Sequence, residues 1–428
     1  MLKYIWMVIQ DLFVAVTLVS LVHTVIHTRF GKQGLKVHWF GIAVGTASSI
    51  ALAIVKNTTN KIISSRWNHK IYIVIVLFTL VFLVLWLLSG KKKRKTGVWA
   101  VLTCIAGAGL SASWIFYSLP GSIAYPFTFN TMGNGYWSWY FFSRLIGWGL
   151  AFLILAVYAG FLHKCAFRLR RKSLPPLVLF LIAASNAFFC LCRFFVPWVN
   201  RAKWLSWPVR FDKETHAWAL ALVRFGSDYA MLFIWITAIL VFILMLVFFA
   251  ENTHVNDPYD NPAQLRKLRA RNRNRRRQAV GLLLTLALSV VSMTFVRAYD
   301  TREVALSEPE TYKVEDDRIL VPMDSVSDGH LHRFEYRTEN GVNVRWIVVK
   351  KPGSASFGVG LDACEVCGNA GYYENNGRVI CKRCDVVMNI NTIGFKGGCN
   401  PIPLTYEVDG GNLVFAIRDL EAGEREFK

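Results

Sequence analysis

The stretch "YAMLFIWITAILVFILMLVFFA" at residues 229–250 contains no charged side chain. A helix needs about 20 predominantly apolar residues to cross the hydrocarbon core of a bilayer. The stretch "IYIVIVLFTLVFLVLWLLS" at residues 71–89 has the same character. Both stretches therefore predict transmembrane helices. They indicate that the fold class is a polytopic α-helical membrane protein.

Further apolar stretches bring the predicted number of spans to about eight. The predicted spans are residues 4–26, 37–55, 71–89, 97–118, 138–162, 174–195, 229–250 and 279–297. The first span carries Asp11 and the last is short, so seven spans are the alternative.

The composition indicates a chain with two parts. Its 428 residues are 54% hydrophobic, and the mean hydropathy of +0.35 is too high for one soluble domain. Residues 1–297 carry 34 Lys and Arg against 7 Asp and Glu, whereas residues 298–428 carry 15 against 21. The positive charge stands in short runs between apolar stretches, which is typical of membrane proteins. We therefore expect membrane lipid as a partner and no nucleic acid.

The loop charges predict the orientation, because Lys and Arg are retained on the cytoplasmic side. One set of alternate loops holds 21 Lys and Arg, against 10 on the opposite side. The richer loops are residues 28–36, 90–96, 163–173 and 251–278. Placing them inside the cell puts the N-terminus and residues 298–428 outside the cytoplasm.

Few polar side chains lie within the predicted spans. Asp11, His23 and His27 are on the first span, and an ionisable residue inside a membrane is a functional candidate by default. No second acidic residue stands within helical reach of Asp11, which disfavours an ion relay on that span alone. Cys190 and Cys192 on the sixth span are interpreted as packing residues.

The exported tail is predicted to be a small β-rich domain at residues 318–428, after a linker at residues 298–317. "LHRFEYRT" and "VNVRWIVVK" flank "ENG", and "TYEV" and "LVFAI" flank "DGGN", so each pair predicts a hairpin. Aliphatic residues are sparse between the hairpins. A domain of this size then benefits from a covalent or metal staple.

Five cysteines supply the candidate staple. Cys364 and Cys367 form one CxxC pair, Cys381 and Cys384 form a second, and Cys399 follows alone. Two CxxC turns on a hairpin can present four thiolates to one zinc or iron ion. Thiolates also suit iron–sulfur clusters and Cu(I). Disulfide bonds and a redox-active dithiol remain alternatives, because the tail is predicted to lie outside the cytoplasm.

Two further features could contribute to this centre. Cys399 stands in "GGCNPIPL", where glycine and proline residues fix the backbone, so it is either an extra ligand or part of a tight turn. His330 and His332 alternate on one strand face, about 7 Å apart by the strand rise. They could join a metal site or form a solvated strand face.

The tail resembles the FtrD-like family of membrane iron–sulfur proteins over residues 318–428. The motifs that carry the resemblance are "DGHLHRFEY", "VRWIVVKK", "LDACEVCGNAGYY" and "VICKRCDVVMNINTIGFKGGCNPIPL". The resemblance implies a bacterial inner-membrane protein linked to iron uptake. It also implies two partners, an Ftr-type iron permease and a periplasmic iron-binding protein.

By matching positions, the resemblance makes all five tail cysteines metal- or cluster-binding residues. The opening "MLKYIWMVIQDLFVA" looks faintly like the first span of an iron permease. That span uses an Arg-Glu-x-x-Glu iron motif, and Gln10, Asp11 and Val14 stand in its place here. Because the motif is broken, we expect no iron conduction through this chain.

The resemblance and the predicted topology conflict. Iron–sulfur clusters are normally built in the cytoplasm, whereas the tail is predicted outside it. The metal loads outside, or the centre is mononuclear or a dithiol, or the topology is inverted. The charge count disfavours inversion, which leaves a metal or redox cysteine centre as the expectation.

The expected function is a membrane-anchored metal-binding or redox component of iron uptake, passing electrons or iron through the cysteine centre. The alternative is an assembly subunit of an iron permease, with a structural zinc or disulfide staple. A transporter with a path through the spans is disfavoured by the scarcity of buried charges. An electron-transfer or transport accessory role is favoured over a classical enzyme.

Overall fold

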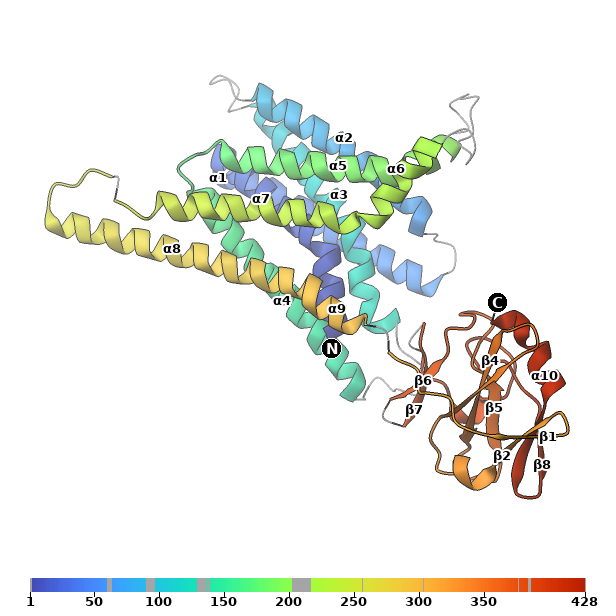
Figure 1. Ribbon diagram of the computed structural model, residues 1–428. Helices are drawn as coiled ribbons and strands as arrows, with labels where there is room; N and C mark the ends of the chain where they lie inside the picture. Colours follow the sequence, from blue (N-terminus) through green and yellow to red (C-terminus); the bar gives the residue numbers. More distant parts are fainter. Residues whose placement is uncertain are drawn as a thin grey trace. The chain divides into compact units, whose positions relative to one another are not determined.

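The computed structural model describes most of the chain in two compact units (Figure 1). The described residues are 2–59, 64–89, 97–128, 137, 139–201, 217–255, 257–302, 304–375, 377–383 and 386–427. The first unit comprises Met1–Phe129 and Trp139–Thr301, and we call it the membrane unit. The second contains Arg302–Lys428, and we call it the C-terminal domain.

The membrane unit is helical. Its helices are α1 (Leu2–Thr58), α2 (Ser64–Leu88), α3 (Val98–Thr128), α4 (Trp139–Arg168), α5 (Leu174–Arg201), α6 (Ala217–Asp228), α7 (Ala230–Glu251), α8 (Pro262–Val291) and α9 (Arg297–Asp300). A single π-helical turn, Ser292–Val296, joins α8 to α9. Pro262 occupies the first turn of α8, and Asn261 caps that helix by accepting a hydrogen bond from the N–H of Gln264.

Among the described residues, seven helices are long and apolar enough to cross a membrane. Counted as helices, the predicted number of about eight was therefore slightly too high. The spans predicted at residues 4–26 and 37–55 lie in the single element α1, because only Gly31 interrupts it. Gly31 has φ 62° and ψ −150°, a conformation that is essentially restricted to glycine.

The chain reverses direction at Gly31. The Nδ1 atoms of His23 and His38 are 3.1 Å apart, whereas 15 residues of straight helix would separate them by about 22 Å. The two arms of α1 therefore fold against each other. This reversal needs almost no loop, which explains why apolar periodicity alone did not give the number of helical elements.

Small residues allow the second arm of α1 to approach α3 closely. A Cβ atom on Gly41 would lie 2.6 Å from the carbonyl oxygen of Ala108, and one on Gly45 would lie 2.8 Å from the Cα of Ala112. Small residues spaced by four are typical of helix contacts in membranes, where close packing supplies much of the association energy.

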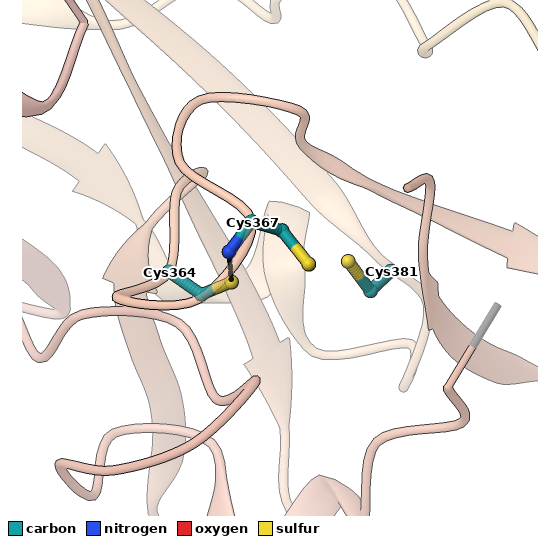
Figure 2. A group of neighbouring side chains, drawn as sticks. All are labelled: Cys364, Cys367 and Cys381. Carbon is teal, nitrogen blue, oxygen red and sulfur yellow. Dashed lines mark hydrogen bonds between the residues drawn. The ribbon is translucent and has the colours of Figure 1, made fainter. Parts of the chain in front are cut away.

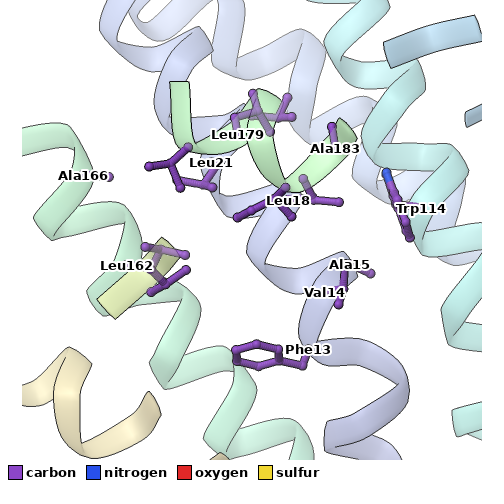
Figure 3. Close-up of a cluster of buried hydrophobic side chains, with 14 of the residues drawn as sticks. Phe13, Val14, Ala15, Leu18, Leu21, Trp114, Leu162, Ala166, Leu179 and Ala183 are labelled. Atoms are coloured by element: carbon purple, nitrogen blue, oxygen red, sulfur yellow. The ribbon is translucent and has the colours of Figure 1, made fainter. Parts of the chain in front are cut away.

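The core of the membrane unit is apolar and draws on several helices. Figure 3 shows Phe13, Leu18 and Leu21 of α1 near Leu162 of α4 and Leu179 of α5, and all five are buried. On α2, by contrast, Leu77, Val84 and Leu87 are each more than half exposed. Exposed apolar side chains on such a helix suit contact with lipid.

Polar contacts tie the termini of the membrane unit together. Trp6 donates from Nε1 to Asp300 at 2.8 Å, and Arg297 donates to Gln10 at 3.1 Å. The start of α1 and the end of α9 are therefore neighbours. Two of the basic loops also meet, because Arg170 and Arg271 both pair with Asp257.

The C-terminal domain is β-rich, as predicted. Its strands are β1 (Lys313–Glu315), β2 (Arg318–Pro322), β3 (His332–Arg337), β4 (Asn343–Lys350), β5 (Phe357–Leu361), β6 (Tyr372–Asn375), β7 (Arg378–Cys381), β8 (Glu407–Asp409) and β9 (Asn412–Ala416). They form antiparallel sheets of order β1-β2-β9-β8, β3-β4-β5 and β6-β7. Short helical turns lie at Met323–Val326, Ile390–Thr392, Ile417–Ala422 (α10) and Glu424–Glu426. The predicted hairpins correspond to β3-β4 and β8-β9.

Strand β4 builds two cores at once, because its side chains alternate between its two faces. Trp346 and Val348 pack with β2 and β9 in one cluster. Ile347 and Val349 pack with the cysteines in another. The cysteines thus share an apolar core with a central strand. Strand β1 lies within the segment expected as a linker and pairs with β2.

Candidate metal centre

Cys364 and Cys367 lie in a tight turn that follows β5. The N–H of Cys364 donates to the carbonyl of Gly368 at 3.1 Å, and the N–H of Gly368 donates back at 2.9 Å. Gly368 has φ 65°, which glycine adopts without steric cost. The N–H of Cys367 also donates to the Sγ of Cys364 at 3.1 Å. Hydrogen bonds to the sulfur atoms are a common feature of metal centres that are held by cysteines.

Cys381 comes from the β6-β7 hairpin. It ends β7 and pairs with Tyr372 across the hairpin. Its N–H donates to the carbonyl of Val386 at 3.0 Å, which begins the turn beyond the strand. Cys381, the first cysteine of the second CxxC pair, therefore stands where a strand ends and a turn begins.

The three sulfur atoms converge. The Sγ atoms of Cys364, Cys367 and Cys381 all lie within 4.8 Å of one another, and the residues are 2%, 6% and 1% exposed. Figure 2 shows the sulfurs of Cys367 and Cys381 directed toward each other. Among the described residues, this is the only group of three or more potential metal ligands with such spacing.

The donor set fits a thiolate-bound metal. Metal–sulfur bonds of about 2.3 Å in a tetrahedron place sulfurs about 3.8 Å apart, which is compatible with the observed limit of 4.8 Å. In clusters of several irons, the thiolates bind different iron atoms and stand further apart. The geometry thus fits a single soft or borderline ion most directly.

The other two predicted cysteine ligands are placed differently. Cys384 lies outside the described residues. Cys399 is half-buried and packs against the cluster that contains the other sulfurs, but it is not in the group within 4.8 Å. Its carbonyl accepts a hydrogen bond from the hydroxyl of Tyr372 at 2.6 Å. The Cys399 loop therefore contacts the centre both by packing and through this hydrogen bond of Tyr372.

A buried ionic network positions Tyr372. Asp362 is completely buried and accepts from Arg333 at 3.0 Å and from Arg345 at 3.2 Å. Its other oxygen accepts from the N–H of Tyr372 at 2.8 Å. Burial, together with the nearby Cys364 and Cys381, raises the pKa of the Tyr372 hydroxyl, so it remains a neutral donor. The network fixes β6 relative to the turn that carries Cys364.

The "GGCNPIPL" loop is pinned to β5. Leu361 donates to the carbonyl of Ile402 at 2.7 Å, and Ile402 donates to Ala363 at 3.0 Å. A Cβ on Gly360 would lie only 2.7 Å from Pro401, so glycine is needed for this approach. Gly398 has φ 63°, which turns the chain just before Cys399.

The two histidines do not join the sulfurs in the part of the domain that the structure describes. The Nδ1 of His330 lies 2.8 Å from Glu374. His332 lies 2.9 Å from Glu310 and 2.8 Å from Asp328. Burial lowers the pKa of His332, but its hydrogen bonds to these carboxylates outweigh that effect and raise its pKa above the ordinary value.

Fold and site together define the class: a polytopic membrane protein whose C-terminal domain holds a buried cluster of thiols. Within it, residues 326–427 match the family model described as "Membrane iron-sulfur containing protein FtrD-like". For the C-terminal domain, this match confirms the resemblance predicted from the two CxxC pairs and the "GGCNPIPL" motif. No curated protein and no solved structure matched the chain.

Sequence reasoning missed the residues that support the cysteines. Asp362 stands two residues before Cys364, and a lone acidic residue at the end of an apolar strand was an available signal. Tyr372 and Arg333 gave no such signal, because their roles depend on which strands pack together.

Proposed function

We propose that the protein is a membrane-anchored metal or redox component of a bacterial iron-uptake system, which passes electrons through the cysteine centre of its C-terminal domain. The observation that carries this proposal is the convergence of three buried sulfurs inside the region that matches the FtrD-like family. Thiolates are typical ligands of iron in electron-transfer proteins.

Each cysteine has a proposed role. Cys364, Cys367 and Cys381 hold the metal, and the N–H of Cys367 stabilises the charge on the sulfur of Cys364. Cys384 is proposed as the fourth ligand from its CxxC spacing alone. Cys399 is proposed to cover one side of the metal centre by packing against the cluster of the other cysteines. Iron bound by these thiolates would take up and release one electron.

The surface beside the centre offers a route for electrons. Val366, between the two cysteines of the first turn, is 67% exposed, and Phe395 is 60% exposed. Glu365 and Lys396, their neighbours in the chain, form an ion pair at 3.8 Å. We propose that this surface meets an electron-transfer partner, or the permease and the iron-binding protein that the family resemblance implies.

The proposed location is the bacterial cell membrane, with the C-terminal domain outside the cytoplasm. The proximity of Trp6 to Asp300 supports placing the N-terminus and the exit to the domain on one side. The distribution of Lys and Arg over the loops supports assigning that side as the outer one.

An assembly subunit with a structural zinc is the second candidate. The observation that favours it is the close spacing of the sulfurs, which suits a single tetrahedral ion. The two candidates differ in chemistry, because zinc has no redox change whereas iron does.

The test is to purify the full chain anaerobically in detergent and measure iron, zinc, acid-labile sulfide and the visible spectrum. Under the redox proposal, iron copurifies and its absorption bleaches reversibly with dithionite. Cys364→Ser with Cys367→Ser abolishes the iron, whereas Cys192→Ser on α5 leaves it unchanged. Stoichiometric zinc without iron, or paired cysteines without metal, would reject the redox role and support the structural one.

A further inference from the structure

Four histidines meet inside the membrane unit, whereas the cysteine centre belongs to the C-terminal domain. His23 and His27 lie on the first arm of α1, His38 on the second arm, and His163 on α4. The ring centroid of His23 is 5.1 Å from that of His38 and 4.8 Å from that of His163. The rings of His27 and His163 stack at 5.4 Å. Imidazoles gathered at this density within membrane-spanning helices call for a functional explanation.

The closest pair has the spacing of two ligands of one ion. Two nitrogens bound at 2.0–2.1 Å in a tetrahedron stand about 3.3 Å apart. The Nδ1 atoms of His23 and His38 are separated by 3.1 Å. His38 is completely buried, so its nitrogens have no access to water and must be satisfied from within the unit.

A hydroxyl orients His38. The Nε2 of His38 lies 2.8 Å from the Oγ of Ser111 on α3. Metal-binding histidines typically use their second nitrogen for such a contact, which fixes the ring and leaves the first nitrogen for the metal. Ser111 thus leaves Nδ1 of His38, which faces His23, as the nitrogen available for an ion.

A second hydroxyl fixes the tautomer of His163. The hydroxyl of Thr24 donates its only hydrogen to the carbonyl of Ser20 at 2.8 Å. At the 3.0 Å contact between Thr24 and Nδ1 of His163, the histidine must therefore be the donor. A neutral His163 then has its lone pair on Nε2, which is free to bind a metal.

The fourth histidine has an unsatisfied atom. The Nδ1 of His27 is buried and has no hydrogen-bond partner among the described residues. Buried polar atoms are nearly always paired, so an exception indicates a missing partner such as an ion or water. The orphaned nitrogen belongs to the ring that stacks on His163.

Two of the four histidine rings line a cavity. A cavity of about 510 Å³, mostly apolar, opens between α1, α3 and α4, and both His23 and His163 line it. The basic turn at Gly31 lies eight residues beyond His23, roughly 12 Å along the helix. The histidine cluster therefore borders a cavity with room for an ion and its remaining ligands.

We propose that His23 and His38 are two ligands of a second metal site for a borderline divalent ion such as Fe²⁺, Co²⁺ or Zn²⁺. A small shift of the neighbouring His163 or His27 ring supplies the third ligand, because no three of these nitrogens all lie within 4.8 Å of one another among the described residues. Imidazole nitrogens suit these ions. The site stands on the histidine geometry alone and does not depend on the cysteine centre.

The test uses the full chain in detergent with the cysteine centre as isolated, and Co²⁺ as the probe. We expect one additional Co²⁺ per chain by equilibrium dialysis, with visible bands but without thiolate charge-transfer absorption. His23→Gln and His38→Gln each weaken this binding at least tenfold. Ser111→Ala weakens it about tenfold by releasing the His38 ring.

His254→Gln, an exposed histidine between α7 and α8, is the matched control and leaves the binding unchanged. Ser111→Ala retains every imidazole, so it keeps the test informative if a glutamine variant fails to fold. Absence of additional Co²⁺ in the folded wild-type chain would overturn the proposal. So would binding that none of these substitutions alters, and the cluster would then be a hydrogen-bonded network only.

Discussion

The two clusters of ligand side chains are built in opposite ways. The sulfurs of Cys364, Cys367 and Cys381 come from one short segment, where backbone hydrogen bonds of a turn and a hairpin aim them. The histidines of the membrane unit come from positions as far apart as His23 and His163, and only helix packing brings them together. The cysteine centre is thus a locally built site, which keeps its geometry as long as its turns form. The histidine cluster is a packed site, whose geometry depends on the whole helix bundle.

We expect the largest effect from a variant that removes the cysteine centre. Cys364→Ser with Cys367→Ser replaces two thiolates by hydroxyls, which bind soft and borderline metals poorly. We expect the domain to lose essentially all of its metal and to become much more susceptible to protease, because metal binding and folding are coupled. Metal analysis and pulse proteolysis of the full chain measure both effects. Metal at wild-type stoichiometry in this variant would contradict the assigned ligands.

The next largest effect is expected from a variant that tests whether the buried ionic network of Asp362 supports the cysteine centre. Asp362→Asn leaves the guanidinium of Arg333 buried without its countercharge. Breaking a buried pair in this way typically costs about 3–5 kcal/mol. We expect faster hydrogen exchange in β4, β5 and β6, measured by mass spectrometry.

Asp409→Asn, on the exposed strand β8, is the matched control for the same chemical change. We expect its exchange pattern to equal that of the wild type. Equal protection of β6 in both variants would show that Asp362 does not hold Tyr372 in place.

Much of the C-terminal domain could be predicted because its signals are local. "ENG" and "DGGN" stand between alternating residues, and the structure has hairpins at both places. The CxxC spacing indicated the first turn, since the geometry of Cys364 and Cys367 depends only on the residues around them. The network of Asp362 with Arg333 could not be predicted in the same way, because it joins two residues that are 29 positions apart in the chain.

The packed site was harder to predict for the same reason. His23 and His27 were recognised as polar residues within a span, but His38 and His163 were not connected with them. Their meeting depends on the reversal at Gly31 and on contact with α4. The count of helices differed at that reversal as well, because the two arms of α1 are joined without an intervening loop.

A third experiment weakens the packed site alone. Gly31→Ala forces a side chain into a backbone conformation that costs about 1–3 kcal/mol for other residues. We expect a lower unfolding temperature of the membrane unit and weaker Co²⁺ binding to the proposed histidine site. Metal in the cysteine centre should not change. Gly149→Ala, where a Cβ meets open space within α4, should leave the unfolding temperature equal or slightly higher.

The smallest effect concerns pH. The pKa of His332 is raised in the folded domain, so protonated His332 stabilises the fold below its ordinary pKa of about 6.5, and this stabilisation is lost as the pH rises through the folded value. The partner carboxylates are about half exposed, so we expect at most about 1 kcal/mol. Pulse proteolysis of His332→Gln should differ from the wild type more at pH 6 than at pH 9. A difference that grows with pH would refute this assignment.

The central claim is that Cys364, Cys367 and Cys381 bind one metal together. X-ray absorption of the anaerobically purified full chain, at the edge of whichever metal it contains, tests this most directly. We expect a shell of three or more sulfurs at about 2.3 Å from the metal. A shell of only oxygen or nitrogen atoms at about 2.0–2.2 Å, or a chain without bound metal, would contradict the claim.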